Sequence, residues 1–233
     1  MEYIHHYHSP LGGITMASDG EVLTGLWFDG QKYFAVTLAK EHEEKMLPVF
    51  EETDRWLDIY FQGKEPDFLP PVSFASGSEF RQEVWKILLS IPYGKTMTYG
   101  EIAACIAKQR GLTRMSAQAV GGAVGHNPIS IIVPCHRVVG TDGSLTGYAG
   151  GIDKKVGLLK LEHADMEQFM CRKREQHYKS GFRIRWKIEV RQTSKVNVYY
   201  FAKMIELVYN KNNSKKGVNR DEIFYRHRKC RRY

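Results

Sequence analysis

The chain lacks the features of a membrane-spanning or a disulfide-bonded secreted protein. Its 233 residues contain no apolar run near the ~18 residues that a transmembrane helix needs, and the N-terminal MEYIHHYHSP has neither the basic nor the apolar region of a signal peptide. The four cysteines, Cys105, Cys135, Cys171 and Cys230, are far apart and form no CxxC pair. This spacing argues against a zinc ribbon and, in a cytoplasmic chain, against a disulfide framework. We therefore expect a cytoplasmic protein whose cysteines are single thiols.

The net charge of +8 is unevenly distributed. Residues 1–164 contain 15 basic and 19 acidic residues, whereas residues 165–233 contain 19 basic and 7 acidic residues. The basic character belongs to the last part of the chain, so the overall charge alone does not indicate nucleic-acid binding. A composition of 42% hydrophobic and 26% charged residues is typical of a globular protein, and the length allows one or two domains.

Residues 1–73 have the pattern of a small α/β domain. The stretches GGITMASDG and EVLTGLWFDG alternate apolar and polar residues around an Asp-Gly turn, which predicts an antiparallel hairpin. Residues 48–61 predict a helix, and the proline-rich residues 62–73 predict a linker. The apolar residues expected on the buried face of the helix are Phe50, Trp56, Leu57, Tyr60 and Phe61.

Residues 74–164 predict a mainly helical domain. SEFRQEVWKILLSIP predicts a helix capped by Ser78, and Thr98 and Glu101 have the spacing of a capping box that begins a second helix. MSAQAVGGAVGHNP predicts a third helix from Ser116, and residues 153–162 predict a final one. Two short helices joined by a loop are the outline of a helix-turn-helix.

The stretch IIVPCHRVVG places a thiol, an imidazole and a guanidinium side by side. Its branched apolar residues 131–133 predict a short buried strand that Pro134 ends. A free thiol has a pKa of about 8.5, so Cys135 needs a base to become a nucleophile. Neighbours on an extended chain point to opposite faces, so we expect His136 to act through a bridging water rather than by direct contact. A buried structural cysteine is the alternative, which this pattern leaves open.

Two further polar residues are candidates for the same site. Asn127, in GHNP, either makes a turn before proline or holds the thiol or the adjoining backbone. Glu162 either orients a histidine as the third member of a relay or is an ordinary surface glutamate.

Glycine and alanine are concentrated in AQAVGGAVG, and each glycine weakens a helix by up to about 1 kcal/mol relative to alanine. This composition indicates that something approaches the helix closely, either the first region of the chain packed against it or nucleic acid lying along it. The N-terminal His5, His6 and His8 lack a carboxylate or thiol at ligand spacing, so we expect no metal site.

Three segments resemble the O6-alkylguanine-DNA alkyltransferases, also called methylated-DNA–protein-cysteine methyltransferases. They are IPYGKTMTYGEIA, AVGGAVGHNPISIIVPCHRVVG and GSLTGYAGGIDKKVGLLKLE. The strong resemblance covers residues 75–164, and residues 1–74 are compatible with that family's small, variable N-terminal domain. The resemblance implies DNA repair by direct reversal, in which the cysteine takes the alkyl group from O6-alkylguanine once per protein molecule, after the base has been flipped out of the duplex.

The implied partner is double-stranded DNA that carries O6-alkylguanine, and we expect a monomer with no cofactor and no membrane association. Activity on O4-alkylthymine and the preference between methyl and bulkier groups stay open.

The resemblance also implies roles for individual residues. The nucleophile is Cys135, His136 is the base that acts through water, and Glu162 orients it. Asn127 organises the site, and Tyr99 protonates or polarises the leaving guanine. The residues implied in the base pocket and in DNA binding are Arg137, Val138, Tyr148, Ala149 and Gly150, with Ala117, Gln118 and Gly121 on the slim helix expected in the minor groove.

The chain departs from the family pattern in three places. Gln118 stands where the family commonly has an arginine, and Gly157 stands where a tryptophan is frequent, which weakens the expected support for Glu162. Residues 165–233 extend beyond the usual end, and GFRIRWKIEVRQ predicts a strand with one apolar and one basic face. This tail is interpreted as an auxiliary nucleic-acid surface, as an interaction module, or as a poorly ordered or non-native extension.

Two rival functions are consistent with parts of this pattern. A cysteine hydrolase using Cys135 and His136 would turn over many times. A protein that only binds alkylated DNA would shift its mobility in a gel without removing the alkyl group.

Overall fold

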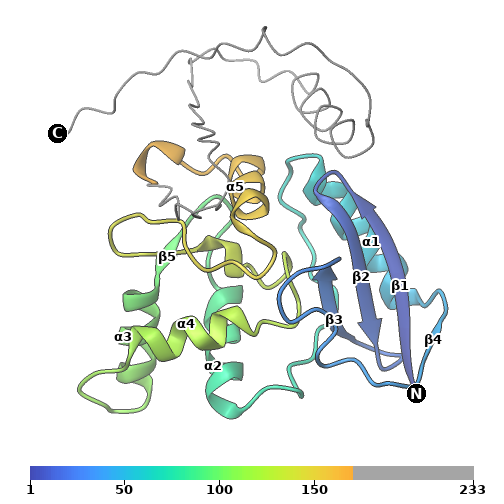
Figure 1. Ribbon diagram of the computed structural model, residues 1–233, viewed down its shortest axis with the longest axis horizontal. Coiled ribbons are helices and arrows are strands. Elements are labelled where there is room, and N and C mark those ends of the chain that lie inside the picture. Colours follow the sequence, from blue (N-terminus) through green and yellow to red (C-terminus); the bar gives the residue numbers. More distant parts are fainter. Residues whose placement is uncertain (170–233) are drawn as a thin grey trace, which may run out of the picture. The chain divides into compact units, whose positions relative to one another are not determined.

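The computed structural model describes residues 1–169, and its N-terminal part is a small sheet with a helix along one face (Figure 1). The strand order is β3-β2-β1-β4, with antiparallel pairing throughout except between β1 and β4, which are parallel. The predicted α/β domain with a mainly antiparallel sheet is therefore confirmed. Its elements are β1 (Glu2–Ser9), β2 (Gly12–Ser18), β3 (Leu23–Phe28), β4 (His42–Glu44) and α1 (Pro48–Phe61).

The predicted hairpin is formed by β2 and β3, which pair from Ile14 opposite Phe28 to Ser18 opposite Leu23. The carboxylate of Asp19 closes the turn by accepting the backbone N–H groups of the two residues that follow Gly20, each at 3.0 Å. These hydrogen bonds also lower the pKa of Asp19. The sequence therefore located this turn from its local chemistry.

The C-terminal part is mainly helical, as predicted, and contains the helix-turn-helix pair α3 and α4. Ser78 and Ser116 cap α2 and α4 through their hydroxyls, and Thr98 and Glu101 form both halves of the capping box of α3. The elements are α2 (Glu79–Leu89), β5 (Met97–Thr98), α3 (Tyr99–Gln109), α4 (Ala117–Gly125), the 3₁₀ turn η1 (Cys135–Arg137), β6 (Val138–Val139), α5 (Ile152–Leu161) and the 3₁₀ turn η2 (Met166–Gln168).

The predicted strand at residues 131–133 is wrong, although its three residues are buried as expected. The backbone there forms consecutive turns, with Ile131 at a φ of +69° and hydrogen bonds from Ile132 N to Ser130 O and from Val133 N to Ile129 O. A short apolar run carries no periodicity that separates a strand from a buried turn, so burial could be predicted here and conformation could not.

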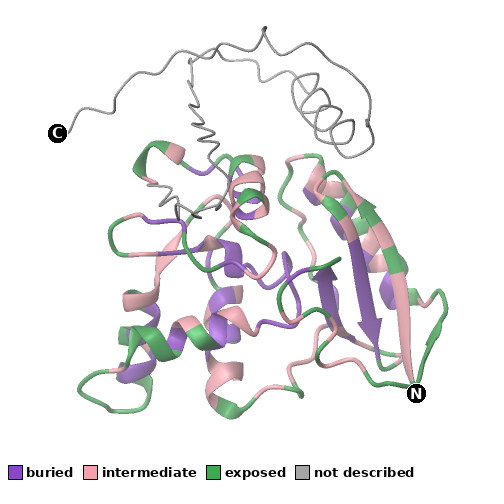
Figure 2. Ribbon diagram, in the orientation of Figure 1, coloured by how far each residue is buried: buried purple, intermediate pink, exposed green. Residues whose placement is uncertain are grey.

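One apolar core runs through both parts, and buried residues gather on β2 and β3 and on the segments facing them (Figure 2). The outer edge of β3 does not face solvent at Leu26. That residue donates to Pro128 O at 2.9 Å and accepts from Ser130 N at 2.7 Å, forming a parallel bridge to Ile129. The segment leading to Cys135 is thereby fastened to the edge of the N-terminal sheet, which also protects an edge that could pair with another chain.

No helix within residues 1–169 is long and apolar enough to cross a bilayer. The predicted strand at residues 182–191 and the basic cluster at the end of the chain lie outside the described residues.

We expect Thr98→Ala to lower the free energy of unfolding by about 1 kcal/mol, because it removes the capping box that begins α3. Chemical denaturation measures this change. The control is Gln109→Ala at the exposed other end of α3, which should change stability by less than about 0.5 kcal/mol. Equal losses in the two variants would contradict a specific contribution from the cap.

Candidate active site

Cys135 begins η1 and is buried, with 5% of its surface exposed. The side chain of Asn127 lies at the centre of the loop before it. Its amide nitrogen donates to Ile129 O at 3.0 Å, to Val133 O at 2.8 Å and to the Sγ of Cys135 at 3.2 Å, so two hydrogens are shared among three acceptors. Its amide oxygen accepts the N–H of Ile129 at 3.0 Å. Asn127 therefore holds both the thiol and the turn that carries it.

His136 and Glu162 form a fully buried pair. The Nε2 of His136 lies 2.7 Å from the Oε1 of Glu162, and both side chains have zero exposure. Nε2 therefore carries the proton, and Nδ1 keeps its lone pair. Nδ1 is buried and has no hydrogen-bond partner among residues 1–169. Burial lowers the pKa of His136 despite the nearby carboxylate, so the imidazole is neutral and its Nδ1 is able to accept a proton.

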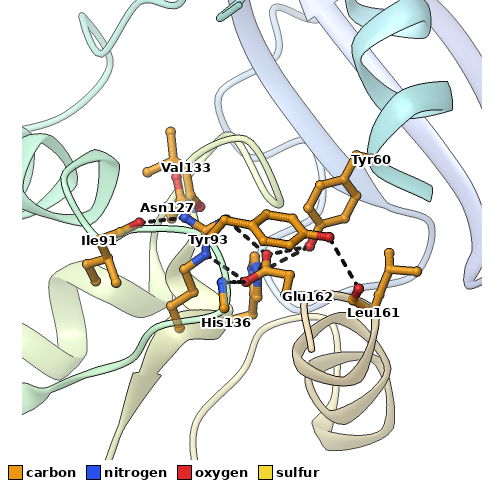
Figure 3. A network of polar contacts seen from close by, with 10 residues as sticks. Tyr60, Ile91, Tyr93, Asn127, Val133, His136, Leu161 and Glu162 are labelled. Atoms are coloured by element: carbon orange, nitrogen blue, oxygen red, sulfur yellow. Dashed lines mark hydrogen bonds and ion pairs between the residues drawn. The ribbon is translucent and has the colours of Figure 1, made fainter. Parts of the chain in front are cut away.

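Glu162, which lies between Tyr60 and His136 in Figure 3, ends α5. Its side chain accepts five hydrogen bonds from the described residues. Its Oε1 accepts from His136 Nε2, from the Tyr60 hydroxyl at 2.7 Å and from Arg137 Nη2 at 3.0 Å. Its Oε2 accepts from Arg137 Nε at 2.9 Å and from Gly94 N at 3.1 Å. Burial disfavours the carboxylate, but the charges and hydrogen bonds of His136 and Arg137 outweigh it and hold the pKa of Glu162 well below its usual range.

A close approach of backbone to Glu162 requires glycine at position 94. Gly94 has a φ of +68°, and a Cβ there would lie 2.6 Å from the carbonyl oxygen of Glu162. The Pro-Tyr-Gly turn after α2 therefore has a part in building the site.

No hydrogen bond joins the thiol of Cys135 to the imidazole of His136 in the described residues. The two lie on a 3₁₀ turn rather than on the extended segment that the sequence indicated. Indirect action of His136 therefore stays a prediction, and its original geometric reason does not hold.

Lys155 is a site residue that the sequence analysis missed. It is fully buried on α5, where its Nζ donates to Val138 O at 2.5 Å and to Thr146 O at 3.2 Å. Burial lowers the pKa of Lys155 to about 8. Burial raises the pKa of the Cys135 thiol, whereas the Asn127 hydrogen bond and the Lys155 charge lower it. The i, i+3, i+4 spacing of Lys155 with Leu158 and Leu159 placed it on the buried face and could have identified it.

Tyr99 begins α3 and lies near enough to Cys135 to interact with it electrostatically. The parallel pairing of β5 with β6 fixes this position, because it aligns Thr98 with Val139, just after η1. The Tyr99 hydroxyl donates to Thr146 O at 3.1 Å. Burial and the nearby Cys135 raise the pKa of Tyr99 to about 12, so the phenol stays protonated at neutral pH.

The other residues predicted for the base pocket lie around η1. Val138 and Tyr148 are buried, and the Tyr148 ring meets the His136 ring edge-on with centroids 6.4 Å apart. Gly150 lies against Tyr148, where a Cβ would come within 2.7 Å of the ring.

The α4 residues predicted for DNA lie on an accessible face. Ala117 and Gln118 are exposed, and Gly121 is half-buried beside the ring of Tyr99. Gly157, the second departure from the family pattern, packs against Leu11 of the β1–β2 turn. Glu162 keeps its five donors nonetheless.

The N-terminal domain reaches this region through residues that the sequence analysis did not select. Its loop after β3 makes three contacts: Ser130 Oγ to Gln31 Oε1 at 3.1 Å, Lys32 N to Ala149 O at 3.0 Å, and a stack of Tyr33 on His126 with centroids 4.1 Å apart. The N-terminal histidines have other partners, since His5 pairs with Asp54 and His6 with Thr15.

A buried thiol beside a neutral histidine and an ionised glutamate, on a helix-turn-helix scaffold, suits an enzyme that uses a cysteine nucleophile. The comparisons with known proteins specify this class. Residues 3–74 match the family model described as 6-O-methylguanine DNA methyltransferase, ribonuclease-like domain. Residues 79–164 match the one described as 6-O-methylguanine DNA methyltransferase, DNA binding domain.

Relatives and solved structures agree with these matches. A methylated-DNA–protein-cysteine methyltransferase of Haemophilus influenzae is 41% identical over 160 residues, which cover 69% of this chain and 86% of that protein. One of Mycobacterium bovis is 45% identical over 160 residues, covering 67% and 92%. The Mycobacterium tuberculosis OGT in complex with DNA has a TM-score of 0.59 and 42% identity, covering 72% of this chain and 94% of that one. The chain belongs to the methylated-DNA–protein-cysteine methyltransferases, a family of DNA-repair enzymes.

We expect Lys155→Met to raise the pKa of the Cys135 thiol and to slow its alkylation at neutral pH several-fold, because a buried positive charge favours the thiolate. The measurement is the pH dependence of the reaction with iodoacetamide, followed by mass mapping of Cys135. Lys160→Met, at an exposed position of the same helix, is the control and should match the unchanged protein. An identical thiol pKa in all three proteins would exclude this role of Lys155.

Proposed function

We propose that Cys135 takes the methyl group from O6-methylguanine in double-stranded DNA, once per protein molecule. The observation that carries this assignment is the single buried site in which Asn127 holds the Cys135 thiol beside the His136–Glu162 pair. The sulfur attacks the methyl carbon, an S–C bond forms and the C–O6 bond breaks. The product is a thioether at Cys135, so each protein molecule reacts once.

The thiol proton passes to His136. Its Nδ1 is the basic atom, because Nε2–H is committed to Glu162. Since Nδ1 has no direct hydrogen bond to the thiol, the proton is transferred through an intervening water. Lys155 favours the thiolate, and Asn127 orients it.

The leaving guanine takes a proton from Tyr99. Its pKa of about 12 keeps the phenol protonated until negative charge develops on the base, which makes it a donor rather than a base. Its location against Thr146 O and Gly147 supports this role, because a Cβ at Gly147 would lie 3.2 Å from the hydroxyl.

DNA reaches the site along α4, and the target base flips out of the duplex to meet Cys135, since a stacked base cannot approach a buried thiol. The exposed Gln118 and Ala117, with Gly121 beside Tyr99, make a slim surface at the entrance. Val138, Tyr148, Ala149 and Gly150 form the pocket for the base, whereas the guanidinium of Arg137 is held by Glu162 and by Ile91 O. All of these residues belong to one chain, which supports action as a monomer.

We expect incubation with duplex DNA containing one O6-methylguanine to add the mass of one methyl group per chain, located at Cys135. Cys135→Ala should gain none. Cys105→Ala, which removes the half-buried thiol of α3, should react like the unchanged protein and is the matched control. Intact-protein mass spectrometry with peptide mapping gives the result.

Each other outcome of this experiment has a definite meaning. DNA that remains methylated although it is bound would indicate a protein that only binds alkylated DNA. Loss of the DNA methyl group without a stable mass gain, over many turnovers, would indicate a hydrolase. Either result would overturn the proposal.

We expect Tyr99→Phe to slow the single-turnover transfer on the order of 10²-fold, because it removes the proton donor to guanine. Rapid-quench kinetics with methylated duplex DNA gives the rate constant, and a gel shift gives the affinity separately. Tyr3→Phe, which removes a phenol from β1, is the control. A Tyr99→Phe protein that binds DNA more weakly but transfers at the unchanged rate would assign Tyr99 to binding alone.

A further inference from the structure

Tyr60 connects the N-terminal domain directly to the candidate active site. It lies in the last turn of α1, is fully buried, and donates its hydroxyl to the Oε1 of Glu162 at 2.7 Å (Figure 3). The same hydroxyl is 3.4 Å from the Nε2 of His136. Tyr60 and His136 therefore donate to one carboxylate oxygen, although they come from different domains.

The ring of Tyr60 is held on two sides. It stacks on Trp56 with centroids 5.1 Å apart and an interplanar angle of 12°, and Tyr93 meets it edge-on at 6.1 Å. Packing of this kind restricts the ring, so the hydroxyl has a fixed position relative to Glu162. Burial and the neighbouring carboxylate raise the pKa of Tyr60 well above its usual value, so the phenol is always a donor.

We propose that Tyr60 is a positioning residue for methyl transfer. Its hydroxyl fixes the side chain of Glu162 and weakens the electrostatic interaction of the Glu162 carboxylate with His136. This inference rests on the proposed role of His136 as the base. An oxygen that accepts a further charge-assisted hydrogen bond has less negative charge for its other donors, which here are His136 and Arg137. Tyr60 therefore adds to the effect of burial in keeping the imidazole neutral, with Nδ1 available to the thiol proton, and α1 completes the relay.

The sign of the effect follows from this competition. Without the Tyr60 hydroxyl, the negative charge on Oε1 acts more fully on His136 and stabilises the imidazolium, so the pKa of His136 rises. As the pH is lowered, the transfer rate of the variant therefore begins to fall at a higher pH than that of the unchanged protein. This fall is the acidic limb of the pH–rate profile. A tyrosine that only filled space would leave this pH dependence unchanged.

The other titratable and charged groups around the pair remain in place when the Tyr60 hydroxyl is removed. They are Cys135 and Arg137 from η1, Lys155 from α5, and Tyr93 and Tyr148 from the adjoining segments.

The test is Tyr60→Phe in the full chain, assayed by single-turnover methyl transfer from about pH 5 to 9. We expect a rate at neutral pH lower by on the order of tenfold, and an acidic limb displaced to higher pH. The matched control is Tyr7→Phe, because Tyr7 also donates its hydroxyl to a carboxylate of α1, Asp58, at 2.8 Å but away from the site. Tyr7→Phe should have the same transfer rate at neutral pH and the same acidic limb as the unchanged protein.

A second substitution makes the test independent of any loss of folding. Replacement of Tyr60 by 3,5-difluorotyrosine keeps the ring and makes the phenol a stronger donor, so the acidic limb should move to lower pH. The inference is wrong if Tyr60→Phe folds with the rate and limb of Tyr7→Phe, or if the fluorinated protein moves the limb in the same direction as Tyr60→Phe.

The pKa of His136 is also measured by NMR titration of labelled histidine, without any DNA. This separates the two claims. Failure of methyl transfer in the unchanged protein would overturn the proposed function, whereas an unchanged His136 pKa in Tyr60→Phe would overturn the inference alone.

Discussion

The buried carboxylate of Glu162 is the constraint on which the rest of the site depends. An ionised carboxylate without exposure is tolerated only when its oxygens are hydrogen-bonded and its charge is compensated. Here α1, the turn after α2 and η1 each contribute donors to a residue that ends α5. The positions of these segments are therefore linked, because a shift of any one would leave part of a buried charge without a partner.

The two domains share this constraint. The edge of β3 pairs with residues 128–130, the loop after β3 contacts Ala149 and His126, and Tyr60 reaches Glu162. The N-terminal domain matches a family model of its own, yet it carries none of the proposed reacting groups. Its contribution is to fix the segments on both sides of Cys135, so that the thiol is held in a preorganised position rather than on a free loop.

The sequence predicted most of the elements but fewer of the contacts between them. Caps at Ser78, Thr98 and Ser116 and the Asp19 turn follow from hydrogen bonds within a few residues, so local pattern was sufficient. The strand predicted at residues 131–133 is wrong because the apolar character of these residues indicates burial and not backbone conformation. Asn127, Cys135, His136 and Glu162 were found through their motif and do lie together. Lys155, Tyr60 and Gln31 were missed because each resembles an ordinary helix, core or loop residue.

The sequence by itself determined the family, the identity of the candidate nucleophile and its neighbours, and the helices around them, because these are recorded in contiguous motifs and short-range hydrogen bonds. Only the tertiary structure decided which residues support the chemistry from a distance. Tyr60 lies 102 residues from Glu162, and no local signal marks such a pair. Burial, which shifts the pKa values of His136, Tyr99 and Lys155, is likewise a property of the folded chain, because desolvation depends on every segment packed around the group. The same holds for Glu162, which stays ionised despite its burial because His136 and Arg137 are brought to it by the fold.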